Sequence, residues 1–273
     1  MIETIERLSK QSGCVHPDDY IKDGLVYCHK CHTQKEIMLG LIPKPKKVYC
    51  LCECETKIRD MKEQGFDEKQ IQEQVDRMRK SGVRDESFQQ WTFENDDGTQ
   101  QNTDFAKVYA ENFADDFYKT GSGLIFWGSV GTGKTFLAAC IANYLIDKQI
   151  PALMTTFNKV IDEAFSAPNK AEYYRNFNKY KLLIIDDLGT ERKTDYGMEQ
   201  VFNVIDDRYK SGQPMIITTN LSIKSIKNPE KIEYSRIYDR ILEKCSPVQF
   251  TGKNYRQKAS EVNKKMMSER MKR

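Results

Sequence analysis

Five short apolar segments alternate with longer segments of helical periodicity from residue 104 onward. Short apolar runs rich in β-branched residues predict strands, and apolar spacings of three and four predict helices. The predicted strands are 124–127, 152–156, 182–186, 215–219 and 248–250, and the predicted helices are about 104–119, 134–148, 157–178, 196–211 and 230–244. Strands that alternate with helices predict an α/β fold with a doubly wound, parallel, five-stranded sheet.

The part of the chain before residue 104 has a different pattern. Residues 1–54 are rich in cysteine and turns, and they predict a small separate domain. Residues 55–82 are highly charged, with helical spacings on either side of Gly65, and residues 83–103 are typical of a linker. We therefore expect a small domain at 1–54, a connector at 55–103, an ATPase-sized domain at 104–256 and a tail at 257–273.

Composition and charge limit the classes of function. The 273 residues are 39% hydrophobic and 30% charged, and no apolar run reaches the ~18 residues needed to span a membrane. The first residues lack the apolar segment of a secretory signal, so we expect a cytoplasmic protein with no membrane partner. Residues 251–273 hold eight Lys or Arg against two Glu, a net charge of +6 in a chain whose total is +3. Such a tail is typical of contact with nucleic acid phosphates, or of a solvated terminus.

A phosphate-binding loop follows the first predicted strand of the larger domain. The motif G-x-x-x-x-G-K-[ST] is matched by Gly128, Ser129, Val130, Gly131, Thr132, Gly133, Lys134 and Thr135. Its glycines let backbone N–H groups surround phosphates, and the helix that follows adds partial positive charge. We expect ATP here, with Lys134 at the β- and γ-phosphates and the Thr135 hydroxyl on Mg²⁺.

Polar residues end two further strands. Asp186 and Asp187 follow the apolar run 182–185, and Asn220 follows the strand at 215–219. The carboxyl ends of parallel strands meet at the ligand crevice of a sheet. We expect Asp186 to bind Mg²⁺ with Thr135, Asp187 to polarise the attacking water, and Asn220 to lie near the γ-phosphate.

The order of these motifs resembles a known family. The phosphate-binding loop, Asp-Asp-Leu-Gly at 186–189, Thr-Thr-Asn at 218–220, Ser-Arg-Ile-Tyr-Asp-Arg at 235–240 and Gly-Lys-Asn-Tyr-Arg at 252–256 are similar to those of AAA+ ATPases of the replicative helicase loader group. That group is of the DnaC and DnaI type and also takes in the IstB transposition helpers. The resemblance covers about residues 104–256.

The resemblance implies a role for each polar residue in these motifs. Asn220 is similar to sensor 1, and Arg256 is similar to sensor 2, which acts on ATP of the same chain. Arg240, with Arg236 one turn earlier, is similar to the arginine finger that reaches a neighbouring subunit's ATP. Without the resemblance, Arg236 and Arg240 are an ordinary pair on a helix surface.

Two departures from typical AAA+ sequences refine this expectation. The second carboxylate is Asp187 where most members have Glu, and the loader group shares this feature, which implies slow, switch-like hydrolysis. Only 17 residues follow Arg256, too few for the usual helical lid. The expected AAA+ fold therefore lacks that lid, and nucleotide would be covered by a second subunit or a partner.

The cysteine-rich segment indicates a zinc site. Six of the eight cysteines lie between Cys14 and Cys54, a density that favours metal binding in a cytoplasmic chain. Four thiolates satisfy a tetrahedral Zn²⁺ ion, and a segment this short needs such a crosslink to fold. The expected ligands are Cys28, Cys31, Cys50 and Cys52, with Cys54 or Cys14 as alternates and His16, His29 and His32 as weaker candidates.

Together these features predict an ATP-dependent replicative helicase loader. Its expected partners are a hexameric DNA helicase, single-stranded DNA and further copies of itself through ATP. The resemblance implies a helicase-contacting role for the zinc domain, which IstB helpers generally lack. An IstB-type ATPase that regulates a transposase on duplex DNA is the alternative, and a zinc-dependent interaction module with an inactive ATPase is a third reading.

Overall fold

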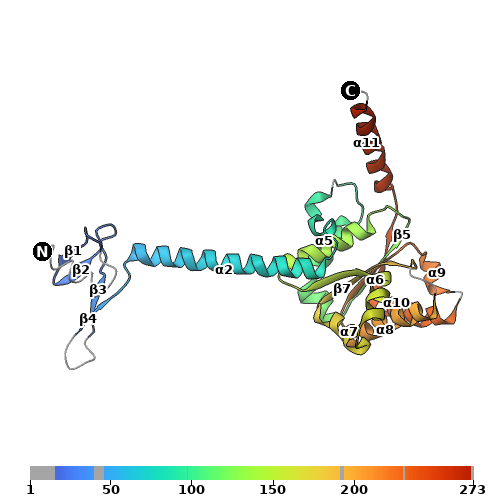
Figure 1. Cartoon of the computed structure of the whole chain (residues 1–273), viewed down its shortest axis with the longest axis horizontal. Coiled ribbons are helices and arrows are strands. Elements are labelled where there is room, and N and C mark those ends of the chain that lie inside the picture. Colours follow the sequence, from blue (N-terminus) through green and yellow to red (C-terminus); the bar gives the residue numbers. More distant parts are fainter. Residues whose placement is uncertain (1–15, 40–45, 97, 191–193, 230, 272–273) are drawn as a thin grey trace. The chain divides into compact units, whose positions relative to one another are not determined.

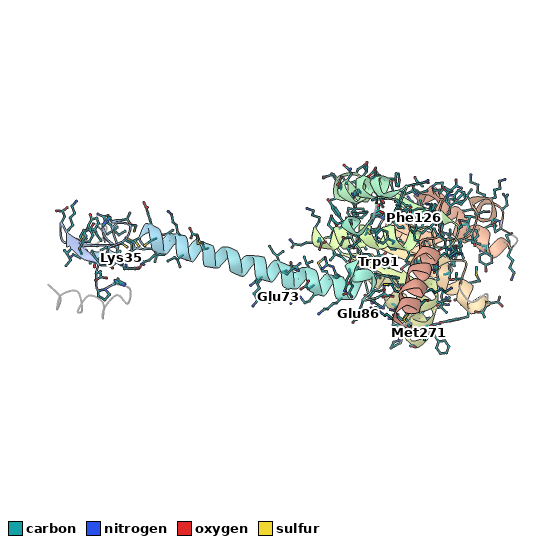
Figure 2. All side chains as sticks on the ribbon, turned by 90° about the horizontal axis from the view of Figure 1, so that it is seen from above. Lys35, Glu73, Glu86, Trp91, Phe126 and Met271 are labelled. Atoms are coloured by element: carbon teal, nitrogen blue, oxygen red, sulfur yellow. The ribbon has the colours of Figure 1, made fainter. Side chains whose placement is uncertain are left out.

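The computed structural model describes residues 16–39, 46–96, 98–190, 194–229 and 231–271 (Figure 1). The chain divides into two compact units, Met1–Glu73 and Gln74–Arg273. The boundary falls inside helix α2, Glu53–Gly82, directly after Glu73, which is labelled in Figure 2.

The first unit contains two small antiparallel sheets. Strands β1 (Tyr20–Lys22) and β2 (Leu25–Tyr27) form one, and β3 (Glu36–Leu39) and β4 (Lys46–Tyr49) form the other. The β1–β2 loop is Asp23-Gly24, and both residues have positive φ, as a two-residue turn between twisted strands requires.

An ion triad with buried Lys35 and Asp19 and a half-buried Glu55 stabilises this unit. The Lys35 ammonium (Figure 2) lies 2.9 Å from an Asp19 carboxylate oxygen and 2.8 Å from one of Glu55. Burial alone would raise the pKa of Asp19, but hydrogen bonds with His29 and Lys35 outweigh it and lower that pKa to about 2. The triad therefore ties the strands of the unit to the first turn of helix α2.

Helix α2 is continuous through Gly65, although a glycine inside a helix costs about 1 kcal/mol relative to alanine. Acidic Glu53 and Glu55 lie in its first turn and basic Arg79 and Lys80 in its last, where each charge sign complements the helix dipole. The charged pattern at 55–82 thus specifies one helix, with no break at the glycine.

The second unit is built on a parallel five-stranded sheet, as the sequence predicts. The strand order is β6-β7-β8-β5-β9, and every neighbouring pair is parallel. The strands are β5 (Gly123–Gly128), β6 (Ala152–Thr156), β7 (Leu182–Leu188), β8 (Met215–Thr219) and β9 (Cys245–Phe250).

Helices cover both faces of this sheet (Figure 1). On one face, Leu124 and Phe126 pack with α3 (Thr103–Glu111) and α5 (Lys134–Asp147). On the other face, Ile125 packs in a second core with four further helices. These are α6 (Phe157–Ser166), α7 (Lys170–Asn176), α8 (Asp195–Ser211) and α10 (Ile232–Lys244). Alternate residues of one strand thus enter opposite cores, which confirms the doubly wound α/β fold.

Several helices differ from the prediction. The helix expected at 104–119 is α3 followed by a π-helical turn, Phe113–Phe117, and a short α4, Tyr118–Thr120. The helix expected at 157–178 is divided between α6 and α7 because Pro168 disfavours helical backbone at the preceding residue. A short helix after β8, α9 (Ile223–Lys227), was not predicted.

The segment 83–103, expected to be a linker, packs into the core of the second unit. Val83 and Phe93 are buried there, and Phe88 and Trp91 pack against the same core. The buried side chain of Asn143 donates hydrogen bonds to the carbonyl oxygens of Phe88 (2.8 Å) and Trp91 (2.9 Å). The polar composition of this segment conceals these few anchoring residues.

The segment expected to be a basic tail is largely helical. Helix α11, Tyr255–Arg270, begins after Asn254, whose side-chain oxygen accepts hydrogen bonds from the N–H groups of Arg256 (3.1 Å) and Gln257 (3.3 Å). Across the described residues, no helix combines the length and the apolar character needed to cross a membrane.

Candidate functional site

The phosphate-binding loop connects the end of β5 to the start of α5. Gly128, Gly131 and Gly133 have φ values of 139°, 79° and 90°, a region that favours glycine. A Cβ atom would lie 2.0 Å from the Asn254 Oδ1 atom at position 131 and 1.8 Å from the Gln100 Nε2 atom at position 133. Backbone conformation and close packing therefore both require the glycines of the motif.

Lys134 is buried and points back along the loop. Its Nζ atom donates hydrogen bonds to the carbonyl oxygens of Gly128 (2.9 Å) and Ser129 (2.8 Å) and to the Asn220 side chain (2.9 Å). Burial lowers the pKa of Lys134, while the charges of Asp187 and Asp186 act in the opposite direction. The loop cation and the end of β8 are thus in direct contact.

Asp186 lies beneath the loop and is 6% exposed. The Thr135 hydroxyl is 3.0 and 3.2 Å from its two carboxylate oxygens, and the Thr218 hydroxyl donates to it at 2.5 Å. Burial raises the pKa of the Asp186 carboxyl group, and the hydrogen bonds with Thr218 and Thr135, which lower this pKa, only partly offset that effect. A hydroxyl and a carboxylate in direct contact are a suitable pair of oxygen ligands for Mg²⁺.

A pocket of about 460 Å³ opens beside the loop. It is lined by Trp91, Asn95, Asp96, Gln100, Val130, Gly131, Gly133, Lys134, Thr135, Phe136, Asp187, Asn220, Tyr255 and Arg256. The structure therefore brings Asp187, Asn220 and Arg256 to the same cavity as Lys134, from segments far apart in the chain.

One wall of the pocket comes from the segment before α3, which sequence reasoning took for a linker. The Trp91 ring (Figure 2) lies 5.7 Å from the Phe136 ring, centre to centre, and stacks on Phe88 behind it at 4.3 Å. The Gln100 side chain donates to the Thr132 carbonyl oxygen at 2.6 Å. The aromatic residues Phe88, Trp91 and Phe93 in a mostly polar stretch were the available signal for this wall.

Two of the predicted arginines lie away from this pocket. Arg236 and Arg240 are on α10, and neither lines the cavity. The Arg240 guanidinium pairs with Asp206 at 2.8 Å and lies 4.8 Å from the centre of the Phe202 ring, while Arg236 is exposed. A role for either arginine at a neighbouring subunit's nucleotide stays a prediction, and for Arg240 it requires release from Asp206.

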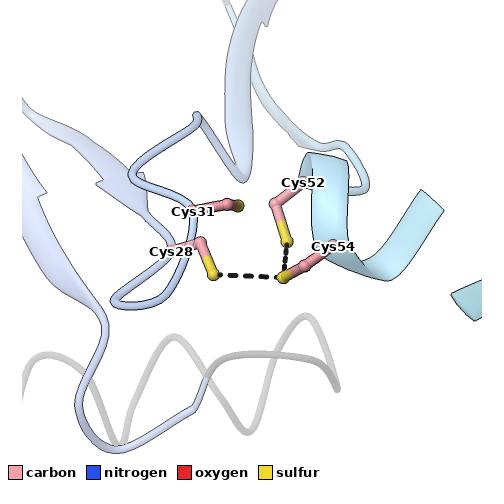
Figure 3. Close-up of side chains that lie close together, drawn as sticks. All are labelled: Cys28, Cys31, Cys52 and Cys54. Carbon is pink, nitrogen blue, oxygen red and sulfur yellow. Dashed lines mark hydrogen bonds between the residues drawn. The ribbon is translucent and has the colours of Figure 1, made fainter. Parts of the chain in front are cut away.

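Four cysteines form a compact cluster in the first unit (Figure 3). The sulfur atoms of Cys28, Cys31, Cys52 and Cys54 all lie within 4.8 Å of one another. The Cys54 sulfur is 3.5 Å from that of Cys28 and 3.2 Å from that of Cys52. Four thiolates about 2.3 Å from one Zn²⁺ ion would lie about 3.8 Å apart, so the cluster fits this ion.

The expectation that Cys50 belongs to this cluster is wrong, and Cys54 takes its place. The Cys50 N–H group bonds to the Lys35 carbonyl oxygen at 2.8 Å, so the backbone continues the β3–β4 pairing, and the Cys50 sulfur lies near the Gln34 carbonyl oxygen at 3.5 Å. Cys52 and Cys54 lie at the start of α2, where the chain turns toward Cys28. The other alternate, Cys14, lies outside the described residues.

Hydrogen bonds in the Cys31–Thr33 turn lower the pKa of the Cys31 thiol to about 5, which favours the thiolate that binds metal.

The histidines lie outside the four-sulfur group. His29 bonds to Asp19 at 3.0 Å through its Nδ1 atom, and the ring of His16 lies 4.3 Å from that of His29. The His32 Nδ1 atom lies 3.2 Å from the Tyr20 hydroxyl.

Relatives of this chain carry two kinds of name. Replicative helicase loader DnaI of Bacillus subtilis is 28% identical over 167 residues, which are 56% of this chain and 52% of that protein. The insertion sequence IS232 putative ATP-binding protein of Bacillus thuringiensis is 29% identical over 147 residues, 51% of this chain and 58% of that protein. This chain therefore spans about half the length of either relative.

A solved structure and a family model agree with these similarities. A crystal structure of DnaI superposes with a TM-score of 0.52 at 25% identity, over 62% of this chain and 92% of that one. The model of the IstB-like ATP binding protein family matches residues 57–263. The resemblance drawn from the motifs is confirmed, since this match takes in more than half of the sequence: the chain belongs to the IstB-like family of ATP-binding proteins.

Proposed function

We propose that this protein is an ATP-dependent loader that binds a hexameric replicative DNA helicase and delivers it to single-stranded DNA. The observation that carries the ATP part is the 3.0 Å contact between the Thr135 hydroxyl and the Asp186 carboxylate. It unites the two halves of a magnesium nucleotide site, the phosphate-binding loop and the end of β7. The names of the relatives support the loader part.

In this proposal the pocket beside the loop holds ATP with Mg²⁺. Thr135 and Asp186 bind the Mg²⁺ ion, which neutralises charge on the β- and γ-phosphates. Lys134 binds the same phosphates, Asn220 contacts the γ-phosphate, and Asp187 orients the attacking water. Hydrolysis is slow because the Asp187 carboxylate is one methylene shorter than the glutamate of most AAA+ enzymes.

Three arginines have roles in nucleotide binding and self-association in this proposal. Arg256 lines the pocket and acts on ATP bound to the same chain. Arg240, with Arg236, acts on ATP bound to a neighbouring copy, so ATP promotes self-association. Basic residues of 251–273 contact DNA phosphates, an interaction that weakens with salt and does not depend on base sequence.

The first unit serves the helicase contact in this proposal, and one Zn²⁺ ion on Cys28, Cys31, Cys52 and Cys54 stabilises it. A segment of this size buries too little apolar surface to fold without such a crosslink. The spacing of the four sulfur atoms supports zinc over free thiols.

The alternative is an IstB-type ATPase that regulates a transposase on duplex DNA. The IS232 relative favours it, because its name joins an insertion sequence to ATP binding. The four-cysteine cluster favours the loader, since IstB helpers generally lack a zinc domain. DNA preference separates the two: a loader binds single strands with its helicase, and a transposase regulator binds duplex DNA.

Size-exclusion chromatography of the full chain mixed with its source's replicative helicase, with ATP or ADP, tests the loader proposal. We expect a stable complex with the wild type and with Cys50→Ser, and loss of that complex for the Cys28→Ser, Cys31→Ser double variant. The Cys50 variant is the matched control because its sulfur lies outside the cluster. No complex with either nucleotide would reject the loader role for this helicase.

A further inference from the structure

The pairing of β7 with β8 is irregular at the two carboxylates. Ile185 pairs with Ile217, but the next pair along the ladder is Leu188 with Thr219. Three steps along β7 therefore correspond to two along β8, so β7 contains one extra residue. Such a β-bulge redirects side chains, and bulges are common next to active sites. Here the bulge comprises Asp186 and Asp187 and lies opposite Thr218.

The bulge requires an unfavourable backbone conformation. Asp187 has a φ of 61°, in the left-handed region that residues other than glycine seldom adopt. The pocket depends on this conformation, because it places Asp187 in the cavity lining while Asp186 stays buried next to it. Neighbouring groups must therefore hold the bulge in place.

One hydroxyl group does so from the neighbouring strand. The Thr218 Oγ1 atom donates a hydrogen bond to the Asp186 carboxylate at 2.5 Å and accepts one from the Asp187 N–H group at 2.9 Å. A hydroxyl can donate and accept at once, so both bonds form together. The Thr218 side chain is fully buried, so its oxygen is shielded from bulk solvent.

The next residue repeats this arrangement on the far side of the bulge. The Thr219 Oγ1 atom donates to the Leu188 carbonyl oxygen at 2.7 Å and accepts from the Leu221 N–H group at 3.0 Å. Asn220 lies in the chain between Thr219 and Leu221, so the hydrogen bond between these two residues fixes the backbone around it. Consecutive threonines of β8 thus hold both the bulged carboxylates and the residue that contacts Lys134.

We propose that Thr218 is a positioning residue: its hydroxyl holds the Asp186 carboxylate toward Thr135 and keeps Asp187 in the left-handed conformation that faces the pocket. Thr218 itself does not line the pocket, so it acts only through these two residues. The inference rests on the proposed MgATP hydrolysis. It adds that the Mg²⁺ dependence of this site is set by a side chain that contacts neither ion nor nucleotide.

Substitution by residues of similar size separates positioning from packing. Thr218→Val keeps the shape and removes both hydrogen bonds, Thr218→Ser keeps the hydroxyl, and Thr218→Ala removes it without placing a methyl group against the carboxylate. Thr155→Val is the matched control, because Thr155 is a buried threonine of β6, the strand on the other side of β7. Thermal melts of all variants report folding.

The measurements are the ATPase rate as a function of Mg²⁺ concentration and the affinity for a fluorescent ATP analogue with Mg²⁺ or with EDTA. For Thr218→Val and Thr218→Ala we expect kcat to fall at least about tenfold and the half-saturating Mg²⁺ concentration to rise by a similar factor, as lost hydrogen bonds to a charged group imply. The affinity of these two variants for the ATP analogue in EDTA should stay within about threefold of the wild-type value. Thr218→Ser should behave like the wild type.

The outcomes distinguish this proposal from the proposed function. If the wild type hydrolyses ATP and Thr218→Val and Thr218→Ala both match Thr155→Val in Mg²⁺ dependence, the positioning role is rejected and the ATPase stands. A wild type that binds nucleotide without hydrolysis rejects the ATPase, and the Mg²⁺ dependence of binding still decides the role of Thr218. If the wild type binds no nucleotide, both proposals fail.

Discussion

The Lys134 Nζ atom lies 2.9 Å from the Asn220 Oδ1 atom, so the phosphate-binding loop and the end of β8 meet at one point. Lys134 begins the helix that follows β5, and Asn220 directly follows β8, which pairs with β5 in the sheet. A phosphate held by Lys134 is therefore within reach of Asn220. Substitutions on either side of this contact therefore test the proposed binding and the proposed hydrolysis of ATP separately.

Substitution of Lys134 and of Asn220 should have different effects. Lys134→Ala should weaken ATP binding at least about 100-fold, because several charged hydrogen bonds to phosphate are lost. Asn220→Ala should lower kcat by about 100-fold and change affinity little, as for a group that acts mainly in the transition state. Calorimetry and steady-state kinetics measure the two quantities. Lys148→Ala, at the exposed end of α5, is the control, and equal losses of affinity at Lys134 and Lys148 would contradict the assignment.

The zinc ligands can be tested one cysteine at a time. Cys54→Ser should abolish bound zinc, about one ion per chain in the wild type, and lower the melting temperature of the first unit, because metal binding and folding are coupled. Cys50→Ser should retain the metal. Elemental analysis of purified protein and thermal melts with and without chelator give the readouts. Zinc loss in the Cys50 variant with retention in the Cys54 variant would restore the original ligand assignment.

Complementation tests whether Arg240 acts between subunits. Arg240→Ala lacks the arginine but keeps its ATP site, while Lys134→Ala lacks the ATP site but keeps the arginine. If Arg240 reaches a neighbour's ATP, mixing these two inactive variants should restore part of the ATPase activity. About half of the interfaces between unlike subunits would then join an intact ATP site to an intact Arg240. Mixing Arg256→Ala with Lys134→Ala should restore nothing, because Arg256 lines the pocket of its own chain. No restored activity in the mixture of Arg240→Ala with Lys134→Ala would exclude an action of Arg240 in trans.

Trp91 should contribute to recognition of the base. Its ring lines the pocket next to the ring of Phe136 in α5, and stacking of a base on an aromatic side chain is worth about 1–3 kcal/mol. Trp91→Ala should therefore weaken ATP binding about tenfold or more and leave the affinity for inorganic triphosphate unchanged. Competition binding with both ligands measures this difference. Equal losses for both would place Trp91 in loop packing rather than base contact.

The pattern along the chain was sufficient for the sheet because its signals are local. Buried parallel strands such as 182–185 are continuously apolar, and the glycines at 131 and 133 mark backbone conformations that other residues avoid. The order of motifs further indicated which family the chain belongs to. Helix ends were less certain, since one proline decides between a single helix and the pair α6 and α7.

The zinc ligands and the pocket wall could not be derived in this way. Cys50, Cys52 and Cys54 are equivalent in sequence, and the β3–β4 pairing directs the first of them away from Cys28. Trp91 and Gln100 come from a polar stretch whose few apolar residues anchor it beside the phosphate loop. Both outcomes depend on contacts between residues distant in the chain.

By itself, the sequence determined the α/β fold, the phosphate-binding loop and the carboxylates at the end of β7, because each follows from the chemistry of adjacent residues. Only the tertiary structure decided that Cys54 completes the cysteine cluster, that Arg240 pairs with Asp206, and that Thr218 holds the bulge at Asp187. Hydrogen bonds, ion pairs and sulfur clusters of this kind require atoms within about 5 Å of one another. The folded sheet brings those atoms together, and spacing along the chain does not reveal which pairs will meet.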